Sequence, residues 1–576
     1  MKSPTDRYAV LTTPYESDLR AGDAPHAAYP RPQMRRDSYI SLNGRWAFAI
    51  QRRRRTVYEG EITVPFPPES RLSGVGRRVG KRDVMIYERT FTLPPDFVRD
   101  RVILHVGACD QYARVYVNSI AAGEEHVGGY LPIELDITNA LHAGENTLRI
   151  EARDPLCRDL PYGKQTKRRG GMWYTAVSGI WQSVWLESVP QEYVRRLRIT
   201  PDLHGVTLEV EGGARDKVLR LGDREYRFSG DRVRVDVENP RLWSPDDPYL
   251  YEVTLTAGED TVTSYFGLRT VTVERHGDRP CICLNGRPVF CHGLLDQGYY
   301  PDGIFLPASP RGYTEDVRLA KACGFNMLRK HIKIEPECFY YDCDRLGVLV
   351  FQDMVNSGRY SFLVDTALPT AFLKRGVVHR AGKRRRAAFE AACRGTLERL
   401  YNHPSVVYYT IFNEGWGQYP ARGVYEACKT WDSTRVYDTA SGWFRTKHSD
   451  VESEHVYFKP VRLHLSRKKP TVLSEFGGYA HRVEGHVFNL KKTYGYKKFT
   501  EQSAFEDALI NLYEAEIVPA ARAGLCGAVL TQLSDVEDEV NGLVTYDRRV
   551  TKVDADAMRR VAAHLEAAFL EGAGGR

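Results

Sequence analysis

The chain has 576 residues, of which 42% are hydrophobic and 27% are charged. This length exceeds what one hydrophobic core supports, so two to four domains are expected. The composition excludes a collagenous, disordered or disulfide-scaffold protein. The net charge of +7 is a small excess of 81 basic over 74 acidic residues, which does not indicate a nucleic-acid partner.

The cysteines and the start of the chain bear on the cellular compartment. Eleven cysteines are an odd number and form no paired metal-ligand motif, so reduced thiols are expected. Residues 1–39 carry charges throughout and lack the apolar core of a signal peptide. No run approaches the roughly 20 apolar residues of a membrane span. These patterns predict a cytoplasmic protein with no membrane partner.

Residues 41–190, which follow an N-terminal extension at 1–40, alternate apolar and polar side chains in short runs. Examples are Val102–Val106, Ala113–Val117 and Thr147–Ala152. A period of two residues is typical of half-buried strands. The region is therefore predicted to be a β-sandwich.

A second block of short alternating runs occupies residues 191–275, with VTLEVEG, RVRVDVE and YEVTLTAG as examples. A block of about 80 residues has the size of a small immunoglobulin-like sandwich. The Pro- and Asp-rich stretch NPRLWSPDDPYLY between its strands is expected to be a loop.

The pattern changes for residues 276–576. Helical stretches such as YTEDVRLAKACGF and RRAAFEAACRGTLERLYN alternate with short apolar runs such as LVFQD, SVVYYTIFN and TVLSEF. Strict alternation of strand and helix predicts parallel βα units, and the length favours a (β/α)₈ barrel with functional side chains at the carboxyl ends of its strands. A doubly wound open sheet is the alternative, weakened because no Gly-rich phosphate loop follows a strand.

Two glutamates stand where predicted buried strands end. Glu414 follows the run Val406–Phe412, and Glu475 follows the run Thr471–Leu473. A carboxylate at a strand tip is partly desolvated and rigidly held, which suits a nucleophile or an acid with a shifted pKa. Two such carboxylates facing one cavity suit glycoside hydrolysis, and a structural ion pair at the rim is the alternative for each.

Several motifs in consistent order resemble glycoside hydrolase family 2. They are SLNGRW, VPFPPES and WYTAVSGIWQSVWLE in the first region, LWSPDDPYLY and FGLR in the second, and LNGRPVFCHG, GFNMLRKH, NEGWGQ and SEFGG in the third. The resemblance covers nearly the whole chain. It implies a jelly-roll sugar-binding domain, an immunoglobulin-like domain and a TIM barrel of the retaining-glycosidase clan.

The resemblance also implies roles for particular residues. Glu414 becomes the general acid/base at the end of the fourth barrel strand, and Glu475 the nucleophile at the end of the seventh. Asn413 is then expected beside the sugar 2-hydroxyl, and Arg329 beside the nucleophile, where its charge favours the ionised form. Tyr457 is expected to hydrogen-bond Glu475.

Other substrate contacts are expected around these residues. His331 and His455 would line the pocket, and Trp443 would stack on a pyranose face. For these three residues a structural role in the core is the alternative. Asp296 and Tyr300, in the segment LLDQGYYPDG after the first barrel strand, are expected at the pocket mouth.

Two departures from the family pattern bear on the substrate. β-Glucuronidases of the family carry an Asn-x-Lys pair near the last strand, but the stretch DEVNGLVTYDRR lacks the lysine, and Gln532 stands where many relatives have a Trp under the sugar. A nearby acidic cluster is expected to be a solvated loop, with a bound divalent cation or a basic partner as the alternative. The cluster comprises Asp535, Glu537, Asp538 and Glu539.

The sequence therefore predicts a retaining exo-β-glycosidase acting on small glycosides or oligosaccharides, with no organic cofactor and no required metal. A galactosidase ranks before a mannosidase, a glucuronidase or galacturonidase, or a furanosidase. A non-catalytic carbohydrate-binding protein and an inverting or transglycosylating enzyme are the alternatives. A homo-oligomer is compatible with this prediction.

Overall fold

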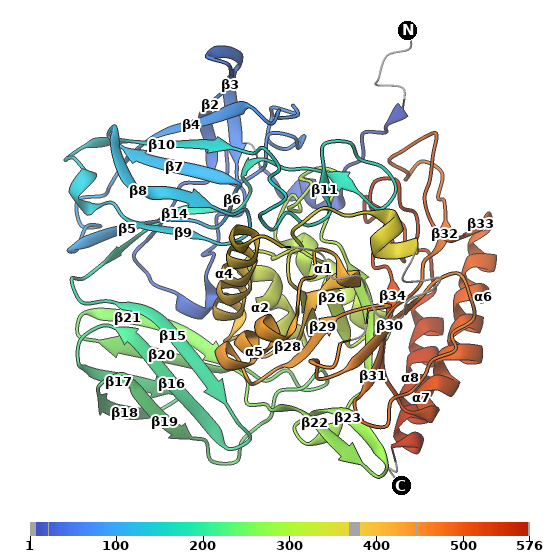
Figure 1. Cartoon of the computed structure of the whole chain (residues 1–576). Helices are drawn as coiled ribbons and strands as arrows, with labels where there is room; N and C mark the ends of the chain where they lie inside the picture. Colours follow the sequence, from blue (N-terminus) through green and yellow to red (C-terminus); the bar gives the residue numbers. More distant parts are fainter. Residues whose placement is uncertain (1–6, 21, 368–380, 445, 574–576) are drawn as a thin grey trace.

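The computed structural model describes residues 7–20, 22–367, 381–444 and 446–573. Two β-sandwiches precede a parallel barrel, and Figure 1 shows the sandwiches, in blue to cyan and in green, stacked along one side of it. The predicted three-part architecture is confirmed. Among the helices in these ranges, none combines the length and apolarity that crossing a membrane requires.

The first sandwich packs a six-stranded sheet, ordered β3-β2-β4-β10-β7-β8, against a four-stranded sheet, ordered β1-β14-β5-β9. Alternate side chains point inward from both sheets and build a core that includes Trp46, Phe48 and Leu104. The strands are β1 (Tyr39–Ser41), β2 (Gly44–Arg52), β3 (Arg55–Val64), β4 (Asp83–Thr92), β5 (Arg101–Val106), β7 (Tyr112–Val117), β8 (Ile120–Val127), β9 (Ile133–Asp136), β10 (Glu145–Arg153) and β14 (Val184–Val189), with the short pairs β6 (Cys109–Asp110) and β13 (Gly179–Ile180), and β11 (Gln165–Thr166) and β12 (Tyr174–Thr175).

The second sandwich has sheets of three and four strands, ordered β15-β16-β19 and β18-β17-β20-β21. Its core includes Leu208, Leu219 and Leu255. A separate sheet, β22-β23-β24, follows, and the expected domain boundary at residue 275 falls inside its first hairpin. The strands are β15 (Val194–Pro201), β16 (Gly205–Gly212), β17 (Asp216–Leu221), β18 (Arg224–Ser229), β19 (Arg232–Asp236), β20 (Tyr251–Ala257), β21 (Asp260–Phe266), β22 (Val271–His276), β23 (Arg279–Leu284) and β24 (Arg287–Pro288).

The barrel sheet has the order β29-β28-β27-β26-β25-β34-β31-β30, and all of its pairings are parallel. Neighbours in the sheet follow one another along the chain, except β25 and β34, which are the first and last barrel strands. The two end strands, β29 and β30, are also consecutive. No reversal of strand order occurs, so the doubly wound alternative is excluded. The strands are β25 (Cys291–Asp296), β26 (Met327–Lys330), β27 (Leu349–Asp353), β28 (Val406–Phe412), β29 (Val436–Ala440), β30 (Glu452–Val456), β31 (Thr471–Gly477) and β34 (Leu525–Thr531).

Helices cover the outside of the barrel, but not after every strand. Within the described ranges no helix connects β29 to β30 or β30 to β31, so the predicted strict alternation is wrong there. After β31 a short parallel pair of strands, β32 (Tyr479–His481) and β33 (Lys497–Phe499), precedes the next helix. The helices are α1 (Arg311–Ala322), α2 (Glu337–Leu346), α4 (Lys383–Leu400), α5 (Arg422–Trp431), α6 (Gln502–Leu512), α7 (Val518–Ala523) and α8 (Ala555–Gly572).

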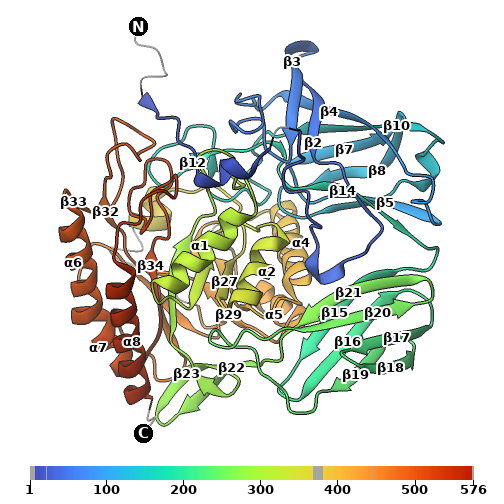
Figure 2. The ribbon, with the colours of Figure 1, turned by 180° about the vertical axis from the view of Figure 1, so that it is seen from behind.

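The N-terminal segment ties the three parts together. Figure 2 shows it in dark blue, crossing the barrel near α1 and then entering the seam between the sandwiches. The Thr13 hydroxyl donates to Asp302 of the barrel at 2.6 Å. In the seam, the buried Arg36 guanidinium pairs with Glu187 of the first sandwich at 3.0 Å and with Asp260 of the second at 2.8 Å. One arginine therefore joins both sandwiches.

All eleven cysteines, which the sequence predicts to be reduced thiols, lie in the described ranges. All eleven are free, and most of them are buried. Burial raises the pKa of the Cys291 thiol to about 12. A thiol in this state stays protonated and is a weak nucleophile.

Candidate active site

The two strand-end glutamates lie together at the carboxyl end of the barrel. Glu475 is part of β31, and Glu414 lies two residues after the end of β28 with a left-handed φ of 49°. One oxygen of each carboxylate and one ring nitrogen of His455 all lie within 4.8 Å of one another. The structure thus brings three of the predicted site residues into one cluster.

Glu475 is the more deeply buried carboxylate of the pair. Arg329 Nη1 donates to one of its oxygens at 3.0 Å, and the Tyr457 hydroxyl donates to the other. Burial by itself raises the pKa of Glu475, but the charges of His455 and Arg329 outweigh burial and lower that pKa to about 2. The carboxylate is therefore ionised at neutral pH, as a nucleophile requires.

The Arg329 guanidinium is fully buried and hydrogen-bonds several residues of the site. Its other nitrogens donate to Asp353 at 3.0 Å and to the Asn413 side-chain oxygen at 2.8 Å. Asp353 also pairs with Nδ1 of His331 at 2.7 Å. The sequence reasoning missed Asp353, although it ends the buried run LVFQD just as the glutamates end theirs. Arg329 fixes Asn413 and Glu475 relative to each other.

Asn413 and Glu414 are held by a second residue that was missed, Ser441. Its hydroxyl donates to the Asn413 side-chain oxygen at 3.0 Å and accepts from the Glu414 backbone N–H at 3.2 Å. Within the described part of the chain the Asn413 amide nitrogen has no partner, so it can donate to a ligand. The Glu414 side chain is 17% exposed, against 6% for Glu475, and contacts His455 at 3.0 Å.

Trp443 packs beside this cluster. Its ring meets the His455 ring edge to face, with centroids 5.5 Å apart, and its N–H donates to the Asp365 carbonyl at 3.0 Å. The indole is half-buried, so part of it stays accessible to a ligand. His455 itself lies between the two glutamates rather than on a separate pocket wall.

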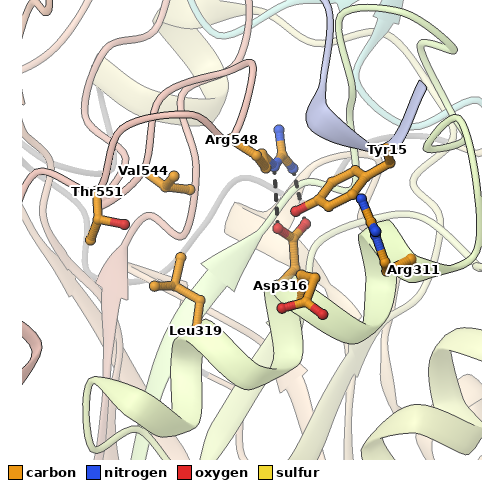
Figure 3. A pocket seen from close by; sticks show the side chains of 8 residues that line it. Tyr15, Arg311, Asp316, Leu319, Val544, Arg548 and Thr551 are labelled. Carbon is orange, nitrogen blue, oxygen red and sulfur yellow. Dashed lines mark hydrogen bonds and ion pairs between the residues drawn. The ribbon is translucent and has the colours of Figure 1, made fainter. Parts of the chain in front are cut away.

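Asp296 and Tyr300 do not join the cluster. Both are buried, with the Asp296 carboxylate paired to Lys330 at 2.5 Å and the Tyr300 hydroxyl donating to Asp316 at 2.9 Å. Figure 3 shows Asp316 paired with Arg548 at the edge of a different cavity, of about 380 Å³. Since internal ion pairs and hydrogen bonds occupy both polar groups, we do not retain the expectation that they line the pocket mouth.

The acidic stretch 535–539 is buried, so the expectation that it forms a solvated loop is wrong. It lies against the loop of the first sandwich that carries β11 and β12. The Tyr174 hydroxyl donates to Glu539 at 3.0 Å, and the Thr175 backbone N–H donates to Glu537 at 3.0 Å. The four carboxylate residues, at 2% to 5% exposure, are Asp535, Glu537, Asp538 and Glu539.

Two β-sandwiches followed by a barrel with paired glutamates at its rim define a multidomain protein of the glycoside hydrolase class. Three family models match consecutive parts of the chain: "Glycosyl hydrolase 2 galactose-binding domain-like" at residues 68–195, "Glycosyl hydrolases family 2" at 205–269, and "Glycosyl hydrolases family 2, TIM barrel domain" at 282–564. Together they span well over half of the sequence. The chain belongs to glycoside hydrolase family 2.

The relatives with which the chain shares sequence or fold are named for activity on different sugars. The chain is 27% identical over 451 residues to a β-glucuronidase of Felis catus, covering 67% of this chain and 65% of that protein. It is 27% identical over 305 residues to a β-galactosidase of Thermoanaerobacter pseudethanolicus, covering 47% and 39%. The chain thus spans less than two thirds of these relatives' lengths. A β-galacturonidase structure from Eisenbergiella tayi matches in fold, with a TM-score of 0.68, 20% identity and coverage of 93% and 98%.

Proposed function

We propose that the protein is a retaining exo-β-glycosidase. The separation of the two glutamates carries the proposal, since their nearest carboxylate oxygens lie within 4.8 Å. Retaining glycosidases place their carboxyl groups about 5 to 5.5 Å apart, whereas inverting enzymes need about 6.5 to 9.5 Å to admit a water molecule. The short separation supports double displacement over the inverting alternative.

The contacts of each carboxylate suit a distinct role in the proposed reaction. In the first step Glu475 attacks the anomeric carbon while Glu414 donates a proton to the departing aglycone oxygen, which leaves a glycosyl ester on Glu475. In the second step Glu414 removes a proton from water, and the water oxygen displaces Glu475. The free amide nitrogen of Asn413 is available to donate to the sugar 2-hydroxyl in both steps.

The names of the relatives bear on the sugar. They include a β-glucuronidase, a β-galactosidase and a β-galacturonidase, so the galactoside preferred from sequence has no advantage over a uronide. Hydrolysis of p-nitrophenyl β-galactoside, β-mannoside, β-glucuronide, β-galacturonide and β-furanosides measures the preference directly. A protein that binds these sugars without releasing nitrophenol would instead be a non-catalytic carbohydrate-binding protein.

Removing each carboxylate tests the roles. We expect Glu475→Gln to abolish turnover, because an amide has no charge with which to attack. Glu414→Ala should slow substrates with poor leaving groups far more than activated aryl glycosides, and azide should partly restore its activity. Proton NMR should show the β-anomer as the first product of the wild-type enzyme.

Glu452→Gln is a matched control, because Glu452 begins β30 and so lies at the opposite end of the strand from His455. This variant should keep wild-type kcat/KM. The double-displacement proposal would be wrong if the α-anomer formed first. The assignment of Glu414 would be wrong if all leaving groups were slowed alike without azide rescue.

A further inference from the structure

The loop of the first sandwich that carries β11 and β12 reaches the barrel rim, and Figures 1 and 2 show these strands over one end of the barrel. The Tyr162 backbone N–H donates to the Asn356 carbonyl at 3.0 Å. Gly163 has a φ of +65° and lies so close to the barrel that a Cβ there would sit 2.9 Å from the Ile332 carbonyl oxygen. The backbone of Lys164 is thereby fixed beside the residue that follows His331.

The Lys164 side chain is partly buried. Throughout the described ranges it has neither a hydrogen-bond acceptor nor a carboxylate within ion-pair distance, and the Tyr174 ring centroid lies 5.9 Å away. The nearby Glu539 carboxylate is already occupied by neutral donors, the Tyr174 hydroxyl at 3.0 Å and the Gln532 amide at 2.8 Å. The Lys164 charge opposes the rise that burial causes in the pKa of Glu539, but within the described ranges no ion pair joins the two groups.

The charge of Lys164 affects the pKa values of two residues of the candidate site. Burial is the largest influence on the pKa of His331, and the charge of Lys164 comes next in lowering that pKa to about 4. The same charge helps to lower the pKa of Glu475, which burial alone would raise. Lys164 thus acts on two residues of the candidate site from a different domain.

We propose that Lys164 is a specificity-determining residue that binds a carboxylate of the substrate, so that the enzyme prefers β-glycosides of anionic sugars, the uronides. The proposal rests on the glycosidase function proposed above. An ammonium partly removed from water gains most from a charged partner, and a charge-assisted hydrogen bond is stronger than one to a neutral hydroxyl. Lys164 would supply from the sandwich a cation in place of the Asn-x-Lys lysine that the barrel stretch DEVNGLVTYDRR lacks.

The test compares substrates that differ only at C6. We would measure kcat/KM for p-nitrophenyl β-glucuronide against β-glucoside, and for β-galacturonide against β-galactoside. The wild-type enzyme should prefer the uronide of at least one pair. Lys164→Gln should lower kcat/KM for that uronide by about 10- to 100-fold, the range expected for a charged hydrogen bond, and leave the neutral partner within about twofold. Lys164→Arg should keep part of the preference because it keeps the charge.

Arg168→Gln is the matched control. Arg168 lies in the same loop and carries the same charge, but its side chain is exposed. Its loss should leave the ratio of uronide to neutral hydrolysis unchanged. Equal losses on both substrates of a pair in Lys164→Gln would indicate a structural role and overturn the proposal, as would a wild-type preference for the neutral sugars.

A binding measurement separates this proposal from the proposed function. If the wild-type protein turned over no glycoside, the glycosidase proposal would fail, but the role of Lys164 would still be decided by NMR titration. Tighter wild-type binding of free glucuronate or galacturonate than of glucose or galactose, lost in Lys164→Gln, would support it. Equal binding of acidic and neutral sugars would refute it.

Discussion

Glu475 combines deep burial with a negative charge. An isolated buried carboxylate costs several kcal/mol, so a group in this position ordinarily takes up a proton. Here the Arg329 guanidinium, the Tyr457 hydroxyl and the neighbouring His455 ring stabilise the anion. The cost of desolvation is offset by fixed donors, which leaves the charge poorly hydrated and ready to react.

His455 gives the first prediction at this scale. Its charge is the largest of those that oppose burial in lowering the pKa of Glu475 to about 2. Without that charge the pKa of Glu475 rises. Activity is lost as pH falls through this pKa, so the acid limb of kcat/KM in His455→Gln should move to higher pH. A profile of kcat/KM against pH, taken where circular dichroism shows folded protein, measures the shift.

Trp443→Phe provides the comparison, because Trp443 packs on His455 but carries no charge. This variant should weaken substrate binding while the acid limb stays where it is. An unmoved limb in His455→Gln would contradict the electrostatic account of the ionised nucleophile.

The residue positions that the sequence predicted well are those at strand ends. Glu414 and Glu475 lie at the tips of the predicted buried runs and come together in the structure, while their catalytic roles stay proposals. Asp353 and Ser441 were missed because their importance depends on contacts between separate strands. Asp296 also ends a strand, yet it pairs with Lys330 instead of facing the cluster. A position at a strand end alone does not show whether a carboxylate faces the cluster or forms an internal ion pair.

At the scale of elements, the loop from the first sandwich depends on Gly163. Its left-handed φ is unfavourable for other residues by roughly 1–2 kcal/mol, and its contact with the Ile332 carbonyl leaves no room for a Cβ. We predict that Gly163→Ala lowers the thermal midpoint and moves the loop off the rim. The kcat/KM for the preferred glycoside should therefore fall together with stability.

Gly277→Ala isolates the effect of that contact. Gly277 has a similar φ of +58°, but a Cβ there would meet no heavy atom within 4 Å. Both variants incur the conformational penalty, and only Gly163→Ala should also lose activity. Equal thermal midpoints and unchanged kcat/KM in the two variants would show that the close approach at the rim is unimportant.

For the whole molecule, the seam between the sandwiches depends on Arg36. Removing it leaves the buried carboxylates of Glu187 and Asp260 without their shared cation. Breaking a buried ion pair in this way costs about 3–5 kcal/mol. We predict that Arg36→Met lowers the free energy of unfolding by that amount in the first unfolding transition, measured by urea denaturation.

The exposed pair of Arg45 and Glu61 serves as the reference. The Arg45 side chain is 80% exposed, and surface pairs contribute about 0–1 kcal/mol. Arg45→Met should therefore change stability little. If both arginine variants unfolded at the same urea concentration, the seam would not be a determinant of stability.

The order and type of the three domains could be predicted because strand periodicity and segment length are local properties of the sequence. The absence of helices from the described residues between β29 and β31, and the burial of residues 535–539, could not be predicted. The acidic stretch looks like a solvated loop when taken alone, because Tyr174 and Thr175, which bind it, lie more than 350 residues earlier in the chain. Burial of that stretch is a property of how two domains meet.

The rim of the barrel is completed by a segment of another domain, and this limits how the protein can be divided. A barrel expressed from residue 276 onward would keep both glutamates. It would lose the loop that carries β11 and β12, and with it Lys164 and Tyr174. The smallest unit able to choose its sugar would then contain the first sandwich as well. If Lys164 selects the sugar, recombining sandwiches among related proteins will alter substrate choice while every barrel residue stays the same.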